Sequence, residues 1–453
     1  MLHSHETPLF GAGLSTNEYW YLAAKAATEQ AVQPLRRSAD IAFVFFTKDH
    51  VEYADKVAEL VRKETGAANL LGVSCEGVIA GEREIERTCG LSVFLGTIPH
   101  CRVRLYSVHD MAHHDYASED ARRRVARVIG ADEHLASSVI FVDPFTVPLL
   151  ELLPAMNECR TKNSHNEPIG SLIGGVASAA EKRGDNRFIL SSGIDTPRMF
   201  DGGGVGISFS HEPDQPHRFD LRTVVSQGCN PFGDPGIVTK VHKNLIVEIG
   251  GRPALQFMQD QIESLNESER EQLKRGLLIG RVIHEYKTRF GRDDFVIRNV
   301  IGADEESGAV AVQDFLRVGQ TVQLHLRDAQ SAHDDLQLLL DGQRLLGKPA
   351  GTLLLTCNGR GSRLFRTAGH DARTIYRAFD SLAPGPELAK AGEYVATQNS
   401  SRMALAGMFA AGEIGPIGND SYLHGHTACA LMFRGADDQD PSPVPQASHS
   451  RTS

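Results

Sequence analysis

The feature that most constrains the fold is an apolar strand followed by an amphipathic helix, an order that occurs three times along the chain. The three strands are Asp40–Phe46, Ser138–Asp143 and Gly351–Cys357. They are rich in β-branched and aromatic residues and apolar enough to be buried on both faces. Further strands follow each helix. This β-α-β-β order predicts an α/β fold with mixed sheets and helices on one side.

The helix after each strand carries apolar residues at i, i+3, i+4 and i+7, so that one face can cover a sheet. These helices contain Ala54 and Val57, Leu149 and Leu152, and Ala372 and Ile375. Pro154 predicts that the middle helix is kinked or short, because an interior proline removes a backbone donor. The recurrence has two interpretations, three internal repeats or the chance pattern of any α/β protein. The fold class is the same under both.

A chain of 453 residues is too long for one ordinary core, so we expect two domains. A block of different strands over 244–341 separates the third unit from the first two. Ser15 and Glu18 stand at capping-box spacing before an N-terminal helix. The predicted division is an N-terminal helical segment over 1–35, domains over 36–230 and 240–433, and a disordered tail over 434–453. The tail is rich in Asp, Pro, Ser and Gln.

Charge and composition exclude several classes of partner. The net charge of −10 opposes binding to nucleic acid and to anionic membranes, which need clustered Lys and Arg. The first ten residues lack a basic start and an apolar run, and no later stretch approaches the length of a spanning helix. We therefore predict a cytoplasmic protein. Its seven cysteines have no paired C-x-x-C spacing, which predicts reduced thiols and neither a zinc cluster nor another cofactor.

Three glycine-punctuated loops are candidate sites. The first, Val225–Pro235, joins the two predicted domains and contains Gln227, Cys229 and Asn230. Gly, Asn, Asp and Pro favour turns there, which indicates a structured linker. The alternative is a cysteine-dependent enzyme with Cys229 as nucleophile. That chemistry requires a base within hydrogen-bond reach of the thiol.

The other two loops belong to the third strand-helix unit. Thr356–Arg363 directly follows a predicted strand, where open α/β sheets bind ligands, and contains Asn358 and Arg360. Ala410–Ala428 contains polar groups in an apolar context. These groups are Glu413, Asn419, Asp420, His424 and His426. The alternatives are a plain surface turn, capping, or a metal site at the two histidines, for which no third ligand is marked. A further cluster of His109, His113 and His114 lies in a polar loop.

At these loops the chain resembles the FIST (F-box and intracellular signal transduction) family. QGCNPFGDPGIVTK (227–240) followed by NLIVEIGGRPAL (244–255) is similar to the junction between its N-type and C-type domains. CNGRGSRLF (357–365), the pair His370-Asp371 and GEIGPIGNDSYLHGHTACALMF (412–433) resemble the C-type domain. ADIAFVFFTKD and LLGVSCEGVIAGERE resemble the N-type domain. The resemblance covers residues 39–433.

The resemblance implies a small-ligand sensory protein, with amino acids as the proposed ligand class, that signals through a protein partner. It carries no family-wide catalytic residue. With neither an F-box nor a kinase or cyclase in the sequence, we expect a stand-alone sensor. The alternatives are an interaction scaffold without ligand and the cysteine-dependent enzyme.

For an amino-acid ligand, Arg360 is predicted to pair with the carboxylate and Glu413 with the ammonium group. Asn358, Asn419 and His424 would supply neutral hydrogen bonds. The competing explanation is that Arg360 and Glu413 pair with each other and tie the two loops together.

Overall fold

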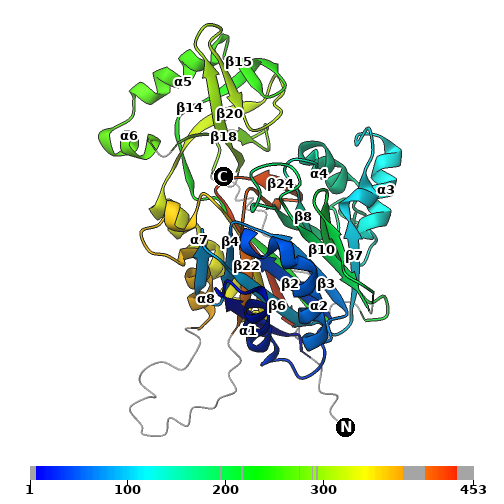
Figure 1. The fold of residues 1–453 in the computed structure, drawn as a ribbon. Helices are drawn as coiled ribbons and strands as arrows, with labels where there is room; N and C mark the ends of the chain where they lie inside the picture. Colours follow the sequence, from blue (N-terminus) through cyan, green and yellow to red (C-terminus); the bar gives the residue numbers. More distant parts are fainter. Residues whose placement is uncertain are drawn as a thin grey trace. The chain divides into compact units, whose positions relative to one another are not determined.

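The computed structural model describes residues 7–193, 195–215, 218–274, 276–287, 289–291, 294–380 and 403–435. The predicted α/β class with mixed sheets in two domains is confirmed, because the chain forms two compact units, the first with mixed sheets and helices and the second with an antiparallel sheet and helices (Figure 1). One unit comprises residues 1–225, 339–421 and 428–453, and the other residues 226–338 and 422–427. The division at residues 230–240 stays a prediction. The predicted tail, apart from 434–435, lies outside the described residues.

The first unit contains three sheets. Their strands are β1 (Leu9–Ser15), β2 (Ile41–Phe46), β3 (Asn69–Ser74), β4 (Gly77–Ala80), β5 (Arg83–Glu86), β6 (Leu91–Thr97), β7 (Cys101–Ser107), β8 (Leu135–Val142), β9 (Ser171–Val176), β10 (Phe188–Ser192), β11 (Arg198–Phe200), β12 (Gly204–His211), β13 (Phe219–Ser226), β21 (Gly351–Cys357), β22 (Ala404–Ala410), β23 (Glu413–Ile417), β24 (Asp420–His424) and β25 (Ala428–Gly435). The strand orders are β1-β6-β2-β3-β10-β11, β24-β23-β9-β8-β12-β7 and β13-β25-β21-β22-β4-β5.

All three sheets share one central arrangement. A parallel pair, β2–β3, β8–β9 or β21–β22, is joined by a crossover helix, α2 (Ala54–Thr65), α4 (Leu149–Glu158) or α8 (His370–Asp380). An antiparallel strand, β6, β12 or β25, lies beside the first strand of each pair. The predicted strand-helix order is therefore observed, and α4 contains Pro154 within its ten residues. The interpretation as internal repeats stays a prediction.

A hairpin from another part of the chain extends each parallel pair. β10 of the hairpin β10–β11 pairs with β3, β23 of the hairpin β23–β24 pairs with β9, and β4 of the hairpin β4–β5 pairs with β22. The hairpin at residues 77–86 thus belongs to the sheet built mainly by residues 351–435. The early and late parts of the sequence are interlocked within this unit.

The core of the first unit lies between the sheets. Phe43 and Phe45 on one face of β2 pack with Phe141 of β8 and Leu353 of β21 in one apolar cluster. The opposite face of β2 packs against α1 (Trp20–Val32) and α2, whose alanines and valines form a second cluster. Alternate residues of β2 therefore serve two cores, which explains why the strand is apolar throughout.

The N-terminal segment differs from its prediction in two ways. Residues 9–15 form β1, which pairs with β6, and α1 begins only at Trp20. The prediction of a capping box at Ser15 is wrong, because the residue before the helix is Tyr19, whose side chain forms no capping hydrogen bond. The strand was not predicted because Gly11 and Gly13 interrupt its apolar pattern. A Cβ at either position would meet a backbone carbonyl oxygen of α1 at 1.8 or 1.9 Å, so only glycine permits this close packing.

The second unit is a seven-stranded sheet with the order β14-β20-β17-β18-β19-β15-β16. Its strands are β14 (Cys229–His242), β15 (Leu245–Ile249), β16 (Arg252–Pro253), β17 (Leu277–Val282), β18 (Phe295–Asp304), β19 (Ala309–Val312) and β20 (Thr321–Arg327). The helices α5 (Ala254–Glu263) and α6 (Glu267–Leu273) lie in this segment, and α7 (Ala329–Arg344) follows β20. Much of the loop expected over 225–235 is strand, with the register shifted between Phe232 and Gly236.

Candidate functional site

The loop after β21 carries Arg360, whose side chain is fully buried. Its guanidinium forms a bidentate ion pair with Asp371 at the start of α8, with Nε–Oδ2 and Nη2–Oδ1 distances of 2.7 and 2.8 Å. The guanidinium carbon also lies 5.3 Å from the centre of the Phe365 ring. The geometry gives Arg360 a structural partner that the sequence analysis had noted only within the His370-Asp371 pair.

Asp371 is the centre of a buried polar cluster. Its carboxylate also accepts a 2.6 Å hydrogen bond from Thr356 Oγ1 and lies 2.9 Å from His370 Nδ1. Burial raises the pKa of Asp371, but the charge and hydrogen bonds of Arg360, together with His370, outweigh burial and leave the pKa below its usual range. Asp371 is therefore ionised inside the protein.

Glu84 of β5 lies against the same cluster and is 8% exposed. Its Oε1 accepts the backbone N–H of Ala372, in the first turn of α8, at 2.8 Å, whereas its Oε2 has no hydrogen-bond partner among the described residues. Burial and the charge of Asp371 raise the pKa of Glu84 to about 8. The hairpin β4–β5 thus brings a neutral carboxylic acid next to a buried carboxylate.

Glu413 is fully buried in β23, where it pairs with Gly175 of β9. Burial raises the pKa of the Cys429 thiol, the charge of Glu413 raises it further, and Arg360 lowers it. Both predicted ionic residues therefore act on one buried thiol. The ion pair that the structure shows for Arg360 is nevertheless with Asp371.

The remaining predicted residues are spread over both units. The Asn358 N–H donates to Ala410 O at 2.8 Å, and Asn419 is exposed, with its backbone carbonyl accepting from Arg160 at 2.7 Å. Gln227, Cys229 and Asn230 belong to the second unit, which also takes His424, because the boundary between the units falls within β24 after Ser421. There His424 and Cys229 are buried, Gln227 Nε2 donates to Phe295 O at 3.0 Å, and Asn230 donates to Ser331. A ligand-binding role for these residues stays a prediction.

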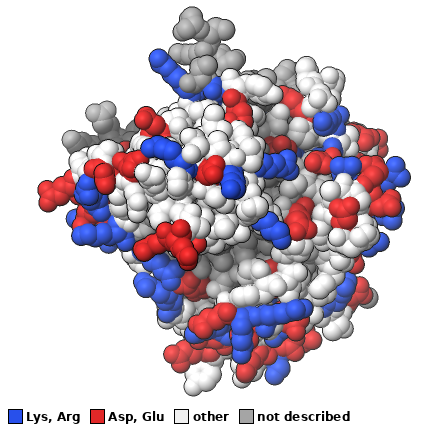
Figure 2. Space-filling view, turned by 90° about the horizontal axis from the view of Figure 1, so that it is seen from above, with Lys and Arg blue, Asp and Glu red and all other residues white. Residues whose placement is uncertain are grey.

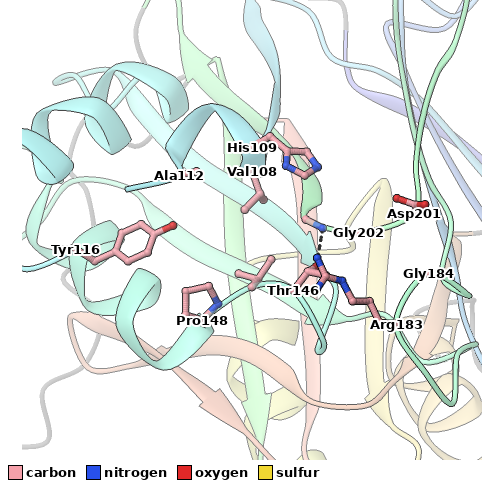
Figure 3. Close-up of a pocket in the computed structure, with 12 residues that line it drawn as sticks. Val108, His109, Ala112, Tyr116, Thr146, Pro148, Arg183, Gly184, Asp201 and Gly202 are labelled. Carbon is pink, nitrogen blue, oxygen red and sulfur yellow. Dashed lines mark hydrogen bonds between the residues drawn. The ribbon is translucent and has the colours of Figure 1, made fainter. Parts of the chain in front are cut away.

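A cavity of about 490 Å³ lies elsewhere, at the carboxyl end of β8. Figure 3 shows its wall, which comes from the segment after β7, the loop between β8 and α4, the loop before β10 and the turn before β12. The lining residues are Val108, His109, Ala112, Tyr116, Thr146, Val147, Pro148, Arg183, Gly184, Asp201, Gly202 and Gly203. Because open α/β sheets bind ligands at strand ends, this position fits a ligand site.

A hydrogen-bond network fixes the wall at the end of β8. Buried Asp143 accepts from Asn186 Nδ2 at 2.8 Å and from Thr146 Oγ1 at 2.7 Å, and Thr146 Oγ1 in turn accepts the Gly203 N–H at 2.8 Å. Three loops are thereby tied together by one carboxylate. The wall is held in place by residues that lie behind it, as a pre-formed site requires.

Gly203 sets the distance between this wall and His109. Its φ of +70° lies in the left-handed region, and a Cβ there would stand 2.5 Å from His109 Nε2. Glycine is therefore required on both grounds. The His109 ring also packs on Phe200, with ring centres 5.6 Å apart. The imidazole is held at the rim of the cavity between these two contacts.

Two opposite charges line the cavity. Arg183 and Asp201 are both exposed, and neither has a hydrogen-bond or ion-pair partner in the part of the chain that the structure describes. In the view of Figure 3, His109, Thr146, Arg183 and Asp201 lie toward one end, whereas Tyr116 and Pro148 lie toward the other. Burial raises the pKa of Tyr116, so its phenol is neutral. The cavity offers a polar, charged end and a less polar end.

Sequence reasoning missed Arg183, Asp201, Thr146 and Tyr116, and it considered His109 only as part of a histidine cluster. One signal was present. Asp143 ends the strand Ser138–Asp143, and the argument that placed a site after the strand ending at Cys357 applies equally there. The glycine run 202–204 before β12 was a second signal.

Other possible sites are limited among the described residues. The described residues contain no group of three or more His, Cys, Asp or Glu side chains arranged to hold a metal ion. None of the helices formed by the described parts of the chain is long and apolar enough to span a bilayer. On the face drawn in Figure 2, blue Lys and Arg side chains are interspersed with red Asp and Glu. The cavity at β8 is therefore the candidate small-molecule site considered below.

Fold and cavity together define an α/β protein with a polar site at the carboxyl end of a parallel strand. Comparison with protein-family models identifies the FIST N domain over residues 40–252 and the FIST C domain over residues 254–416. The chain belongs to the FIST family, whose domains are associated with signal transduction and small-ligand sensing. The predicted presence of both FIST domains, N-type and C-type, in one chain is confirmed.

The similar curated proteins are mycobacterial. One is an uncharacterized protein of Mycobacterium tuberculosis (strain CDC 1551 / Oshkosh), 31% identical over 430 residues, covering 93% of this chain and 99% of that protein. Another is an uncharacterized protein of Mycobacterium bovis (strain ATCC BAA-935 / AF2122/97), 34% identical over 434 residues, covering 93% of this chain and 98% of that protein. The likeness therefore extends over both domains.

Proposed function

We propose that this protein is a cytoplasmic sensor of a small polar metabolite, bound in the cavity at the end of β8, and that it signals through another protein. The observation that carries the proposal is the pair of oppositely charged side chains, Arg183 and Asp201, on the wall of one pre-organised cavity. Family membership supports the sensory role. An interaction scaffold would not require such a cavity, and Cys229, the nucleophile of the enzyme alternative, does not line it.

An amino acid is the proposed ligand class. Arg183 can hold a carboxylate with two parallel hydrogen bonds, and Asp201 can accept from an ammonium group. The side chain of the ligand would extend toward Tyr116 and Pro148. A cavity of about 490 Å³ is within the range of small-molecule sites.

We expect Arg183→Ala to weaken ligand binding by more than about tenfold, because a charge-assisted bidentate contact is lost. The measurement is the shift in thermal stability with a panel of amino acids and related acids. A ligand at 100 times its Kd stabilises the wild-type protein by about 2.7 kcal/mol. Lys182→Ala, in the same loop but outside the cavity lining, is the matched control.

The role of Asp201 is tested by ligand chemistry. Asp201→Asn should weaken the binding of an amino acid. The binding of the deaminated analogue, which lacks the ammonium group, should be almost unaffected. A thermal shift that survives in both cavity variants but is lost in Glu413→Gln would instead support the site predicted at Asn358, Arg360, Glu413, Asn419 and His424. If no compound shifts the wild-type protein while a partner is retained in a pull-down, the scaffold alternative is favoured.

A further inference from the structure

A cluster of large side chains at the start of α1 is exposed on the first unit. Tyr19, Tyr21, Leu22 and Tyr53 are 74, 49, 48 and 37% exposed, and Trp20 is partly exposed among them. We call these five residues the aromatic patch. It lies apart from the cavity at β8 and shares no residue with it.

The rings of the patch contact one another. Trp20 stacks on Tyr53, with centroids 5.9 Å apart and planes 17° apart, and meets the edge of Tyr21 at 5.7 Å. Tyr19 and Leu22 stand three positions apart at the helix start, a spacing that makes them neighbours on one face. Segments far apart in the sequence, the start of α1 and the residue before α2, thus build one surface.

Folding does not account for this surface. The face of α1 that packs on the sheet consists of Ala23, Ala24, Ala27 and Ala31, all fully buried. Trp20 packs in part against the same core, but Tyr19, Tyr21 and Leu22 lie outside that contact, where they cost solubility and gain little packing. Exposed Tyr and Trp are the residue types enriched at the energetic centres of protein interfaces.

The charges around the patch indicate what it binds. Glu18, Asp49, Glu52 and Asp55 are exposed beside it and outnumber the neighbouring lysines Lys48 and Lys56. Glu18 and Asp49 both act on the Cys89 thiol, whose pKa is raised by burial and then by these charges. A cation already sits on the rings, because Lys56 Nζ lies 5.8 Å from the Trp20 centroid and 5.5 Å from the Tyr53 centroid. Ring faces beside carboxylates attract a further cation.

We propose that the aromatic patch is the docking surface for an arginine-containing basic segment of a partner protein. Arginine fits both features, since its planar guanidinium stacks on aromatic rings and pairs with carboxylates. Nucleic acid and anionic lipid fit less well, because four carboxylates repel phosphate. The proposal is independent of the ligand site and supplies the surface through which a sensor can act.

The test uses the chain's only tryptophan, Trp20, as its reporter. Titration of the full-length protein with a short peptide of alternating Arg and Ser should change Trp20 fluorescence saturably. The corresponding Lys peptide should bind more weakly, and a Glu peptide should leave the fluorescence unchanged. Calorimetry provides the affinities of variants in which the fluorescence itself is altered.

The double variant Tyr19→Ala/Tyr21→Ala removes two exposed rings and no charge, so binding should weaken by about tenfold. The matched control is Tyr286→Ala, which removes a fully exposed tyrosine from the second unit. Glu52→Gln/Asp55→Asn should weaken binding and reduce its salt dependence. If the wild-type protein and the Tyr19→Ala/Tyr21→Ala variant bind the Arg peptide with equal affinity, the attraction is non-specific and electrostatic, and the proposal is overturned.

Two further outcomes would also overturn it. A fluorescence change with phosphatidylcholine or phosphatidylserine vesicles, without one for the Arg peptide, would make the patch a membrane contact. Concentration-dependent dimerisation that the double variant abolishes, again without peptide binding, would make it a self-association surface.

Discussion

Replacing Arg360 by Ala is expected to destabilise the protein by about 3–5 kcal/mol, because the substitution leaves the buried carboxylate of Asp371 without its counter-ion. Both side chains are at most 1% exposed, so water cannot replace the lost ion pair. The measurement is urea unfolding near neutral pH. Arg363→Ala is the control, since Arg363 pairs with Glu76 at an exposed position and should contribute about 1 kcal/mol or less.

The same variant separates the two roles considered for Arg360. If folding stability is unchanged and ligand affinity falls, the predicted ligand contact is supported and the ion pair with Asp371 is incidental. A second variant guards against a protein that does not fold. Asp371→Asn retains the shape and one of the two acceptor oxygens but leaves the buried guanidinium of Arg360 without a counter-ion, so it should also destabilise the protein by several kcal/mol if the ion pair is structural.

Local pattern was sufficient to predict the central elements of the fold. The strands β2 and β21 lie within one residue of their predicted bounds, and α2 follows from apolar spacing at i, i+3 and i+4. These elements are buried on faces that the spacing of their apolar residues marks clearly. β1 was not predictable in this way, because its face toward α1 is glycine and only the opposite face, with Phe10 and Leu14, is apolar.

The partners of buried charges were less accessible to sequence reasoning. Arg360 and Asp371 are only eleven residues apart, yet the alternative considered was Glu413, since both loops looked like site walls. Glu84 could not have been placed beside them. Its position depends on β4 pairing with β22, an association of strands more than 300 residues apart that no local pattern reports.

The interlocked sheets bear on how the two sequence domains cooperate. The FIST N match contains β4 and β5, whose glutamates contact the FIST C segment. Glu86 accepts from the Ser362 N–H at 2.9 Å and Glu84 accepts from the Ala372 N–H. The N-type segment therefore completes the sheet of the C-type segment. A structural change in the N-type segment can therefore affect the C-type segment through the sheet that they share.

Glu84 gives the last prediction, a stability that depends on pH. Its folded-state pKa is raised to about 8 from the ordinary 4.5, so between these values the folded protein retains a proton that the unfolded chain has lost. Rising pH therefore favours unfolding, by up to about 1.4 kcal/mol per pH unit, and the full cost is reached above pH 8. Below about pH 4.5 both states are protonated and the cost disappears.

Glu84→Gln should remove this dependence. The amide keeps an oxygen for the Ala372 N–H and carries no ionisable group, so the variant should match or fall below the wild-type protein at pH 5 and exceed it by a few kcal/mol at pH 8. Urea unfolding at the two pH values measures the difference. Glu82→Gln, on the same hairpin but more exposed, controls for the loss of one negative charge. A wild-type-minus-variant difference that is constant from pH 5 to pH 8 would contradict a neutral Glu84, and would mean that the carboxyl is ionised and paired inside the fold.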